Sequence, residues 1–242
     1  MIRSSMISAE KLSKIQALLK RDYPDVKTPL LHTSVFQLLV ATMMSAQTLD
    51  ATVNIYTPAL FTKYPTAKEM SKADPADIDK MINKVNYHNT KAKNIVEMSK
   101  KLLSDYGGVV PFTIEKLTEL PGVGRKTANV VISEWYAQKL KNRGNPWEGG
   151  PKTKIMMNGD ERLTKAEGFV VDTHVIRTSN RLGLSKNKDP KKIEQDLMKI
   201  FPQDEWAEAS LRLIFHGRYR CKARNDMCCV DADWSKLCSS CI

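Results

Sequence analysis

One stretch decides the fold of this chain, and it reads Leu120-Pro121-Gly122-Val123-Gly124-Arg125-Lys126-Thr127. Apolar residues recur at helical spacing on both sides of it, over residues 112–120 before the glycines and over residues 128–135 after them. Thr113 is well placed to cap the first helix, and the second helix is expected to open at about Arg125. The pattern therefore predicts two helices joined by a tight glycine turn, a helix-hairpin-helix.

The two glycines of this turn also indicate what it binds. Gly122 and Gly124 allow the backbone to turn sharply and to approach a ligand closely, which leaves N–H groups at a helix N-terminus available to an anion. A phosphate is the natural anion for a chain with a formal net charge of +11. We therefore expect the turn to grip a DNA backbone, aided by Arg125.

Length and composition narrow the class of protein further. A chain of 242 residues with 42% hydrophobic content can form one large domain or two small ones. Its most apolar window, residues 36–46, is shorter than the roughly 20 residues that a membrane-spanning helix needs. The N-terminal residues lack the apolar core of a secretory signal. These observations predict an intracellular protein of the cytoplasm and nucleoid that is not membrane-bound, with a monomer as the default state.

Helical patterns dominate the remaining sequence, so the predicted fold class is all-α. Residues 169–171 are β-branched or aromatic and fit either a short strand or an extended lead into a helix that begins near Asp172. Residues 140–168 combine glycine, proline and charges of both signs, and we expect an exposed insertion there. Beyond the hairpin, helices are expected over residues 8–21, 33–44, 51–61, 66–71, 75–82, 91–106, 191–200 and 204–216.

Cysteine occurs only near the C-terminus of the sequence. In a reducing compartment, clustered thiols indicate a metal more often than disulfides. Four thiolates suit either a [4Fe–4S] cluster or zinc, and a loop that binds no metal is the third possibility. The five residues are Cys221, Cys228, Cys229, Cys238 and Cys241.

Five segments, taken in order, resemble the endonuclease III family of DNA glycosylases. A helix-hairpin-helix by itself is a weak signal, because many DNA-binding proteins contain one. Five ordered segments that extend across nearly the whole chain are a much more specific signal. They are SAQTLD (45–50), HNTKAKNI (88–95), LPGVGRKTANVV (120–131), VDTHV (171–175) and LIFHGRYRC (213–221).

The resemblance implies a bifunctional DNA glycosylase and AP lyase of base excision repair that removes oxidised pyrimidines. Lys126 matches the family's nucleophile, and both a helix N-terminus and partial burial favour the neutral amine that the chemistry needs. Asp172 matches the carboxylate that stabilises the cationic sugar. Without the resemblance, Lys126 fits a phosphate contact and Asp172 fits a helix N-cap, and the second role is compatible with catalysis.

The same comparison implies how the enzyme opens the duplex. Gln47 matches a residue that is inserted between bases, and Tyr87 stands at the wedge position, where family members often carry an aliphatic residue. Phosphate contacts are expected from the Gly122 and Gly124 turn and from Lys91. His174 fits either a phosphate contact or helix packing.

For the cysteines the match is incomplete. The spacing of Cys221 and Cys228 reproduces the family's first cluster pair, but Asp231 or Ala232 stands where a third cysteine is expected. The predicted ligands of a [4Fe–4S] cluster are Cys221, Cys228, Cys238 and Cys241, with Cys229 as a substitute for its neighbour.

The resemblance also predicts two helical domains that flank a DNA-binding cleft. Residues 28–139 form a barrel that holds the hairpin, and residues 1–27 and 169–242 form a second domain. The partner is double-stranded DNA with damaged bases or abasic sites. The alternatives are a monofunctional adenine or mismatch glycosylase, which generally lacks the lysine, and a non-catalytic helix-hairpin-helix protein, which needs no pairing of Lys126 with Asp172.

Overall fold

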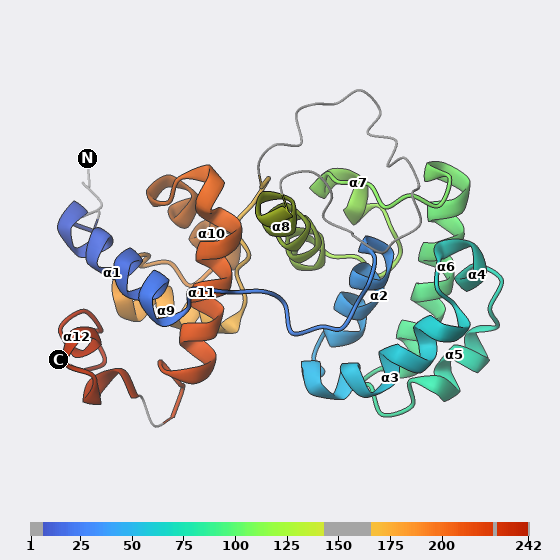
Figure 1. The fold of residues 1–242 in the computed structure, drawn as a ribbon, viewed down its shortest axis with the longest axis horizontal. Helices are drawn as coiled ribbons and strands as arrows, with labels where there is room; N and C mark the ends of the chain where they lie inside the picture. Colours follow the sequence, from blue (N-terminus) through green and yellow to red (C-terminus); the bar gives the residue numbers. More distant parts are fainter. Residues whose placement is uncertain (1–6, 143–165, 225–226, 242) are drawn as a thin grey trace. The chain divides into compact units, whose positions relative to one another are not determined.

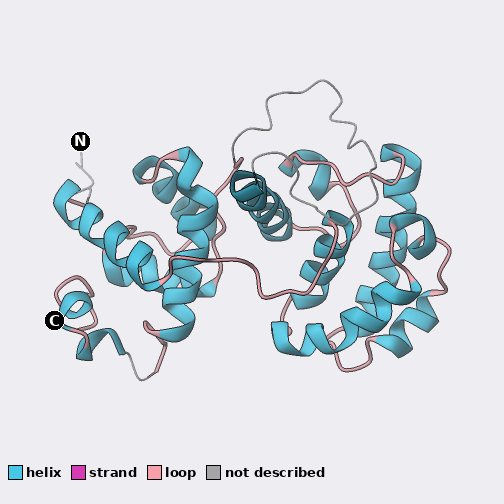
Figure 2. Cartoon of the chain, viewed as in Figure 1, coloured by secondary structure: helices cyan, strands magenta, loops and turns pink. Residues whose placement is uncertain are grey.

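A computed structural model describes residues 7–142, 166–224 and 227–241, with only the backbone given for residues 136–142 (Figures 1 and 2). The chain divides into two compact units, one of residues 28–167 and one of residues 1–27 and 168–242. Most of the predicted insertion over residues 140–168 lies outside the described residues. The α-helices are α1 (Ala9–Asp22), α2 (Val35–Ser45), α3 (Asp50–Lys63), α4 (Ala67–Met70), α5 (Pro75–Met81), α6 (His88–Tyr106), α7 (Ile114–Thr118), α8 (Arg125–Asn142), α9 (Thr173–Leu182), α10 (Pro190–Ile200), α11 (Trp206–Tyr219) and α12 (Ala232–Ser235).

The unit of residues 28–167 is built around α2. All residues from Phe36 to Met44 are buried, so this helix is apolar on every side, as helices at the centre of a domain are. It packs against α3, α6 and α8, while α4 and α5 pack on α6 and α7 packs on α8. The helices around it contribute buried apolar residues to the same core.

Side chains that bond to backbone N–H groups fix where many helices begin. A helix leaves its first N–H groups without intrahelical acceptors, and a serine, threonine or aspartate just before it can accept from one of them. Because this signal is local, most predicted helix starts lie within a few residues of the observed ones. The capping residues are Ser8, Ser34, Thr66, Asp74, Thr113, Asp172, Asp189 and Asp231.

In the unit of residues 1–27 and 168–242, α11 packs against α9 and α1. Gly217 allows α9 and α11 to approach closely, because a Cβ atom at this position would lie 2.8 Å from the Cβ of His174. Ile15, Val175 and Leu213 are fully buried in this unit. The cysteine-rich segment follows α11 directly and contains a 3-10 helix, η2 (Met227–Val230), and α12.

Within the described ranges the chain is all-helical, as predicted. Residues 169–171 form no strand and lead into α9. Of the two structures considered for them, the lead into a helix is therefore the one formed. Two short 3-10 helices, η1 (Gln203–Glu205) and η2, and the four-residue α12 were not predicted. None of the described helices is both long and apolar enough to cross a bilayer.

Candidate DNA-binding and catalytic site

The predicted helix-hairpin-helix is formed by α7, a turn over residues 119–124, and α8. Leu120 and Val123 are buried, and the N–H of Val123 donates to the carbonyl of Leu120 at 3.1 Å. The rings of Phe112 and Trp135 lie on the two flanks with centroids 4.4 Å apart. The apolar residues of the turn therefore anchor it to the core, while Gly122, Gly124 and the first two residues of α8, Arg125 and Lys126, are exposed.

The two glycines of the turn serve different purposes. Gly122 has φ +76°, and a Cβ atom there would lie 2.9 Å from the Cβ of Asn94 on α6 and 3.0 Å from Cε of Met43 on α2. Its lack of a side chain is therefore required by the fold itself. Gly124 has no atom within 4 Å of an added Cβ, so packing does not require glycine there. An open backbone beside a helix N-terminus is what a close phosphate contact needs.

Lys126 lies in the first turn of α8, directly beyond this turn, and it is exposed. The partial burial predicted from the sequence is therefore absent. Exposure leaves the Nζ atom accessible to a sugar carbon carried by DNA. Arg125 precedes it and is also exposed.

Asp172 is the N-cap of α9 and is only 9% exposed. Its Oδ1 accepts hydrogen bonds from the backbone N–H groups of His174 at 2.8 Å and Val175 at 2.9 Å. The capping role predicted from the sequence is confirmed. Two charge-assisted bonds from a helix N-terminus fix the orientation of this carboxylate.

His174 and Arg177 lie between α9 and the start of the cysteine-rich segment. Arg177 donates to the carbonyls of Gly217 at 2.7 Å and Cys221 at 2.9 Å, and its Nη2 lies 3.2 Å from Nδ1 of His174. Burial is the main effect that lowers the pKa of His174 below 6.5. The ring of this half-buried histidine therefore lies beside a neighbouring guanidinium.

Gln47 and Tyr87, which the sequence predicts to enter the duplex, are both exposed and both have left-handed backbones. Their φ angles are 56° and 59°, and no other non-glycine residue in the described part of the chain has a positive φ. Left-handed conformations are unfavourable for residues with a Cβ atom. Gln47 follows the buried helix α2, and Tyr87 is the N-cap of α6, which is buried on one face.

Lys91 is placed differently from the phosphate contact that the sequence predicts. It is 8% exposed, and its Nζ donates to the carbonyls of Met44 at 2.7 Å and Ala46 at 2.6 Å, with Thr48 Oγ1 at 3.3 Å. Burial lowers its pKa to about 8. The ammonium group is thus directed into the protein, toward the C-terminus of α2.

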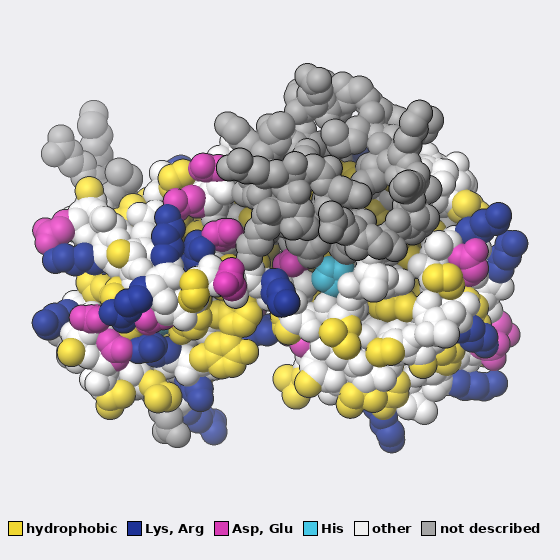
Figure 3. Space-filling model, viewed as in Figure 1, with side chains coloured by type: hydrophobic (Ala, Val, Ile, Leu, Met, Phe, Trp, Pro, Cys, Tyr) yellow, Lys and Arg dark blue, Asp and Glu magenta, His cyan; other side chains and the backbone are white. Residues whose placement is uncertain are grey.

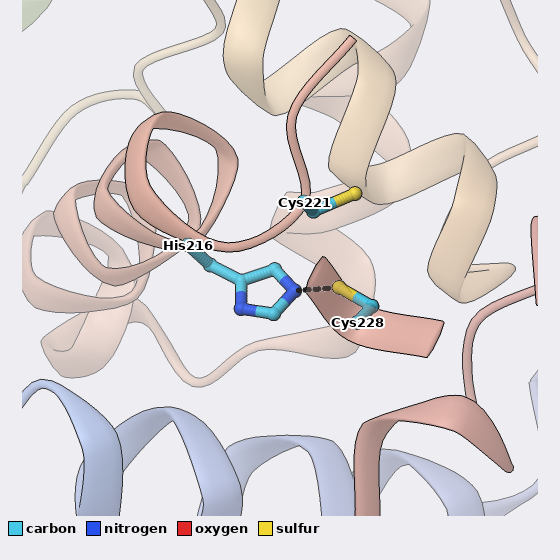
Figure 4. A group of neighbouring side chains, drawn as sticks. All are labelled: His216, Cys221 and Cys228. Carbon is cyan, nitrogen blue, oxygen red and sulfur yellow. Dashed lines mark hydrogen bonds between the residues drawn. The ribbon is translucent and has the colours of Figure 1, made fainter. Parts of the chain in front are cut away.

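The cysteine-rich segment brings three possible metal ligands together (Figure 4). His216 of α11, Cys221 and Cys228 are buried, and their ligand atoms all lie within 4.8 Å of one another. The Nε2 of His216 is 3.4 Å from the Sγ of Cys228. Two thiols and an imidazole are a donor set that suits zinc or an iron–sulfur group, so the residues present fit a metal.

The remaining cysteines are placed differently from the predicted ligand set. Cys238 is buried with its Sγ 2.9 Å from Ser240 Oγ, whereas Cys241 forms a disulfide with Cys229. The structure therefore joins Cys241 to another cysteine rather than bringing it to Cys221 and Cys228.

Asp231 and Ala232, the residues that replace the expected third cysteine, begin α12. Asp231 is the N-cap of α12 and forms an ion pair with Arg220.

Two residues of this region were not found from the sequence. Asn86 bonds the Gln47 turn to the Tyr87 turn, and its position next to Tyr87 in a segment between helices was the available signal. His216 lies five residues before Cys221, and a histidine so close to clustered cysteines was a signal for a mixed ligand set.

The hairpin, with a glycine turn whose exposed side leads into a basic helix start, defines a helix-hairpin-helix protein of the DNA-binding type. Residues 40–203 match the family described as the HhH-GPD superfamily base excision DNA repair protein. That match extends over more than half of the 242 residues.

Relatives narrow the assignment. Endonuclease III of Synechocystis sp. is 37% identical over 240 residues, which cover 99% of this chain and 97% of that protein. Endonuclease III of Bacillus subtilis is 37% identical over 207 residues, covering 85% and 82%. The chain therefore belongs to the endonuclease III family within the HhH-GPD superfamily.

Solved structures agree with this assignment. A trapped covalent intermediate of endonuclease III with DNA superposes with a TM-score of 0.79 at 32% identity and covers 96% of both chains. A non-covalent complex of endonuclease III with DNA gives 0.78 at 33% identity, with the same coverage. A thermostable thymine-DNA glycosylase gives 0.75 at 19% identity, which shows a shared fold.

Proposed function

We propose that this protein is a bifunctional DNA glycosylase and AP lyase of base excision repair that removes oxidised pyrimidines from double-stranded DNA. The observation that carries the proposal is the exposed amine of Lys126, in the first turn of the helix that follows an open glycine turn, in a chain of the endonuclease III family. A relative of this family has been trapped covalently on DNA, which is the behaviour expected of an amine nucleophile.

In the proposed reaction the neutral amine of Lys126 attacks C1′ of the damaged nucleotide while the bond from C1′ to the base breaks. The base leaves with the bonding electron pair and takes up a proton, and the sugar ring opens to give a Schiff base to Lys126. Loss of a proton from C2′ then expels the 3′ phosphate by β-elimination. Hydrolysis of the Schiff base returns the free amine.

Asp172 would act on the positive charge that develops at the sugar in the first step. Its carboxylate is held by two backbone N–H groups, so it needs no reorganisation when that charge appears. Gly122 and Gly124 would hold the DNA backbone through exposed N–H groups, and Gln47 and Tyr87 would fill the space left by the extruded nucleotide. Because the substrate is DNA, the nucleoid is where such an enzyme would act.

The face in Figure 3 bears lysine and arginine side chains over both units, interspersed with acidic ones. A net charge of +11 favours association with any DNA sequence, and phosphate contacts position a protein without reading bases. That property suits an enzyme that must search undamaged DNA for rare lesions.

We further propose that the metal group is a [4Fe–4S] cluster. Cys221 and Cys228 would hold it, with Cys238 as a third thiolate and Cys241 as a fourth once its bond to Cys229 is reduced. When bound, the cluster would supply a rigid crosslink for the segment that carries Lys222 and Arg224. Iron, sulfide and zinc analysis of protein purified under reducing conditions, with its visible absorbance spectrum, distinguishes an iron–sulfur cluster, zinc and no metal.

Borohydride trapping tests the enzymatic proposal. Wild-type protein incubated with duplex DNA that contains thymine glycol or an abasic site should form a covalent adduct on reduction. Lys126→Ala should trap on neither DNA. Lys126→Arg is the matched control, since it keeps the charge for a phosphate contact but cannot form a Schiff base.

The three candidate functions give different results in this assay. Lys126→Arg should bind DNA almost as wild type does and fail to trap, which separates catalysis from phosphate pairing. Base release by the wild type without any adduct would support a monofunctional glycosylase. Binding without base release or strand cleavage would support a non-catalytic DNA-binding protein.

A further inference from the structure

The turn that bears Gln47 and the turn that bears Tyr87 are forty residues apart in sequence but are joined by hydrogen bonds. The side-chain amide of Asn86 donates to the carbonyl of Gln47, and the backbone N–H of Asn86 donates to Thr48 Oγ1 at 3.1 Å. Both turns belong to the unit of residues 28–167. The two left-handed residues are therefore coupled through their immediate chain neighbours.

Lys91 also connects the same two turns, through hydrogen bonds on their buried side. Its backbone N–H donates to the carbonyl of Tyr87 at 2.9 Å, while its side chain reaches Met44 and Ala46, the residues that lead into Gln47. Thr48 Oγ1 lies within reach of both Asn86 N–H and Lys91 Nζ. One lysine thus contacts the first turn with its side chain and the second turn with its backbone.

The chemistry of this position suits a lysine. The last carbonyls of a helix lack intrahelical donors and lie at the negative end of the helix dipole, and Met44 and Ala46 are at the end of α2. An ammonium group carries three donors, and three oxygen atoms lie within hydrogen-bonding distance of it. Burial with a lowered pKa of about 8 is consistent with an amine withdrawn from solvent.

We propose that Lys91 and Asn86 are positioning residues that fasten the Gln47 turn and the Tyr87 turn into one two-pronged wedge, with Lys91 acting inside the protein rather than on a DNA phosphate. This proposal rests on the proposed function, in which Gln47 and Tyr87 enter the duplex. Two unfavourable backbone conformations persist only where surrounding contacts enforce them, and these hydrogen bonds supply such contacts. A wedge that is preformed loses less conformational freedom when it enters DNA.

Lys91→Met tests the proposal, because methionine keeps the length and the apolar stem and removes all three donors. Lys93→Met is the matched control, since Lys93 lies on the same helix, is exposed and carries the same charge. Lys91→Met should slow single-turnover release of thymine glycol by about tenfold or more, with a smaller effect on cleavage at a preformed abasic site, where no base has to be extruded. Lys93→Met should release the base at the wild-type rate.

The salt dependence of binding distinguishes an internal role from a phosphate contact. Affinity for duplex DNA with a reduced abasic-site analogue is measured over a range of salt concentrations. Loss of a phosphate contact lowers the slope of log affinity against log salt by about 1, whereas loss of an internal lysine leaves that slope unchanged. A reduced slope for Lys91→Met, or base release at the wild-type rate, overturns the proposal.

Asn86→Ala provides a second route, because Asn86 is exposed and its replacement does not disturb the core. If thermal unfolding shows that Lys91→Met does not fold, the proposal is tested with Asn86→Ala alone. It should slow base release and leave the salt slope unchanged, and wild-type rates would overturn the proposal.

A double-mutant cycle then shows whether the effect passes through the wedge. In a Gln47→Ala, Tyr87→Ala background, Lys91→Met should cause little additional loss of base release, because the residues that it positions are gone. A fully additive loss overturns the proposal. If Gln47→Ala and Tyr87→Ala themselves release base at the wild-type rate, the insertion step of the proposed function fails. If they are slow while Lys91→Met and Asn86→Ala are not, only the present inference fails.

Discussion

Gly122 and Gly124 provide a direct test of how the hairpin works. Alanine at Gly122 should reduce the stability of the fold, whereas alanine at Gly124 should reduce the affinity for DNA. At Gly122 the added Cβ atom would lie 2.9 Å from the Cβ of Asn94 and 3.0 Å from Cε of Met43, in a residue with φ +76°. The backbone strain costs roughly 1–2 kcal/mol. The contact with Asn94 Cβ cannot be relieved by rotating a side chain, and overpacking of this kind costs about 1–3 kcal/mol.

Part of this cost is offset, because alanine restricts the unfolded chain by about 0.4–1 kcal/mol relative to glycine. We therefore expect Gly122→Ala to destabilise the protein by about 1–5 kcal/mol, which lowers the melting temperature by roughly 2–20 °C for a chain of this size. At Gly124 no atom lies within 4 Å of the added Cβ. Gly124→Ala should change the unfolding free energy by about 1 kcal/mol or less, in the range expected for alanine at a helix N-cap.

For DNA binding we expect the reverse of the effects on stability, with the larger loss in Gly124→Ala and the smaller loss in Gly122→Ala. A methyl group at Gly124 occupies the open space beside the helix N-terminus, so affinity for duplex DNA at fixed salt should fall about tenfold or more, and by a similar factor for unrelated sequences. Thermal unfolding by circular dichroism and fluorescence anisotropy with a labelled duplex measure the two effects. Wild-type DNA affinity in Gly124→Ala would refute the phosphate-binding role of the turn, and a wild-type melting temperature in Gly122→Ala would refute the packing argument.

Three further predictions concern single ionisable side chains. Asp172→Asn should keep the helix cap and the melting temperature but lose base release. Asp172→Ala should lose the cap as well as base release, and the lost cap should cost about 1 kcal/mol of stability. Thermal unfolding and single-turnover assays will measure these effects. Burial lowers the pKa of His174 below 6.5, so the unfolded chain binds the proton of this histidine more readily than the folded chain does. The free energy of unfolding should therefore decrease as the pH is lowered below about 6.5, and it should decrease less in His174→Gln. Urea titrations at several pH values will measure this difference. The pKa of Lys91, lowered to about 8 from 10.5, has a consequence of the same sign at higher pH. Between these two values the unfolded chain holds the proton and the folded chain does not, so stability relative to Lys91→Met should rise with pH by an amount of order 3 kcal/mol. A difference in stability that does not change with pH would contradict the burial of the amine.

The sequence predicted the helices well because their signals are local. Thr113 and Ser8 cap the helices that follow them, and Pro75 opens α5, each within one or two residues of the expected start. The hairpin was equally predictable, since two glycines between two helical periodicities permit few other structures. Such signals depend on neighbours a few residues away and not on the rest of the fold.

The position of the Lys91 amine was harder to predict, although the sequence held a partial signal. Lys91 precedes Ile95 by one helical turn and therefore lies on the apolar face of α6, which indicates burial of its stem. The acceptors for its amine come from α2, more than forty residues earlier, and no local pattern reveals them. The left-handed backbones of Gln47 and Tyr87 are equally non-local, because neither is a glycine that would favour such a conformation.

The cysteine spacing indicated a metal but could not show which side chains meet. His216 joins Cys221 and Cys228 because α11 ends one turn after it and the chain then folds back, as shown by the hydrogen bond from Cys221 N–H to the carbonyl of His216 at 2.7 Å. Spacing within the sequence counts residues along the chain and does not include such a reversal. A search for clustered cysteines alone therefore does not find the histidine that lies beside Cys228.

Hydrogen bonds connect the cysteine-rich segment to the helix that Asp172 caps. Arg177 on α9 donates to the carbonyls of Cys221 and Gly217, so the helix that Asp172 caps is bonded directly to the first cysteine. Arg181, one turn later on the same helix, donates to Cys221 Sγ at 3.4 Å. Disorder in the cysteine-rich segment would remove acceptors from both arginines, and their buried or half-buried guanidinium groups would then need new partners. The rigidity of Asp172 therefore depends on the order of a segment more than forty residues away, and a metal held by that segment would support base removal without taking part in its chemistry.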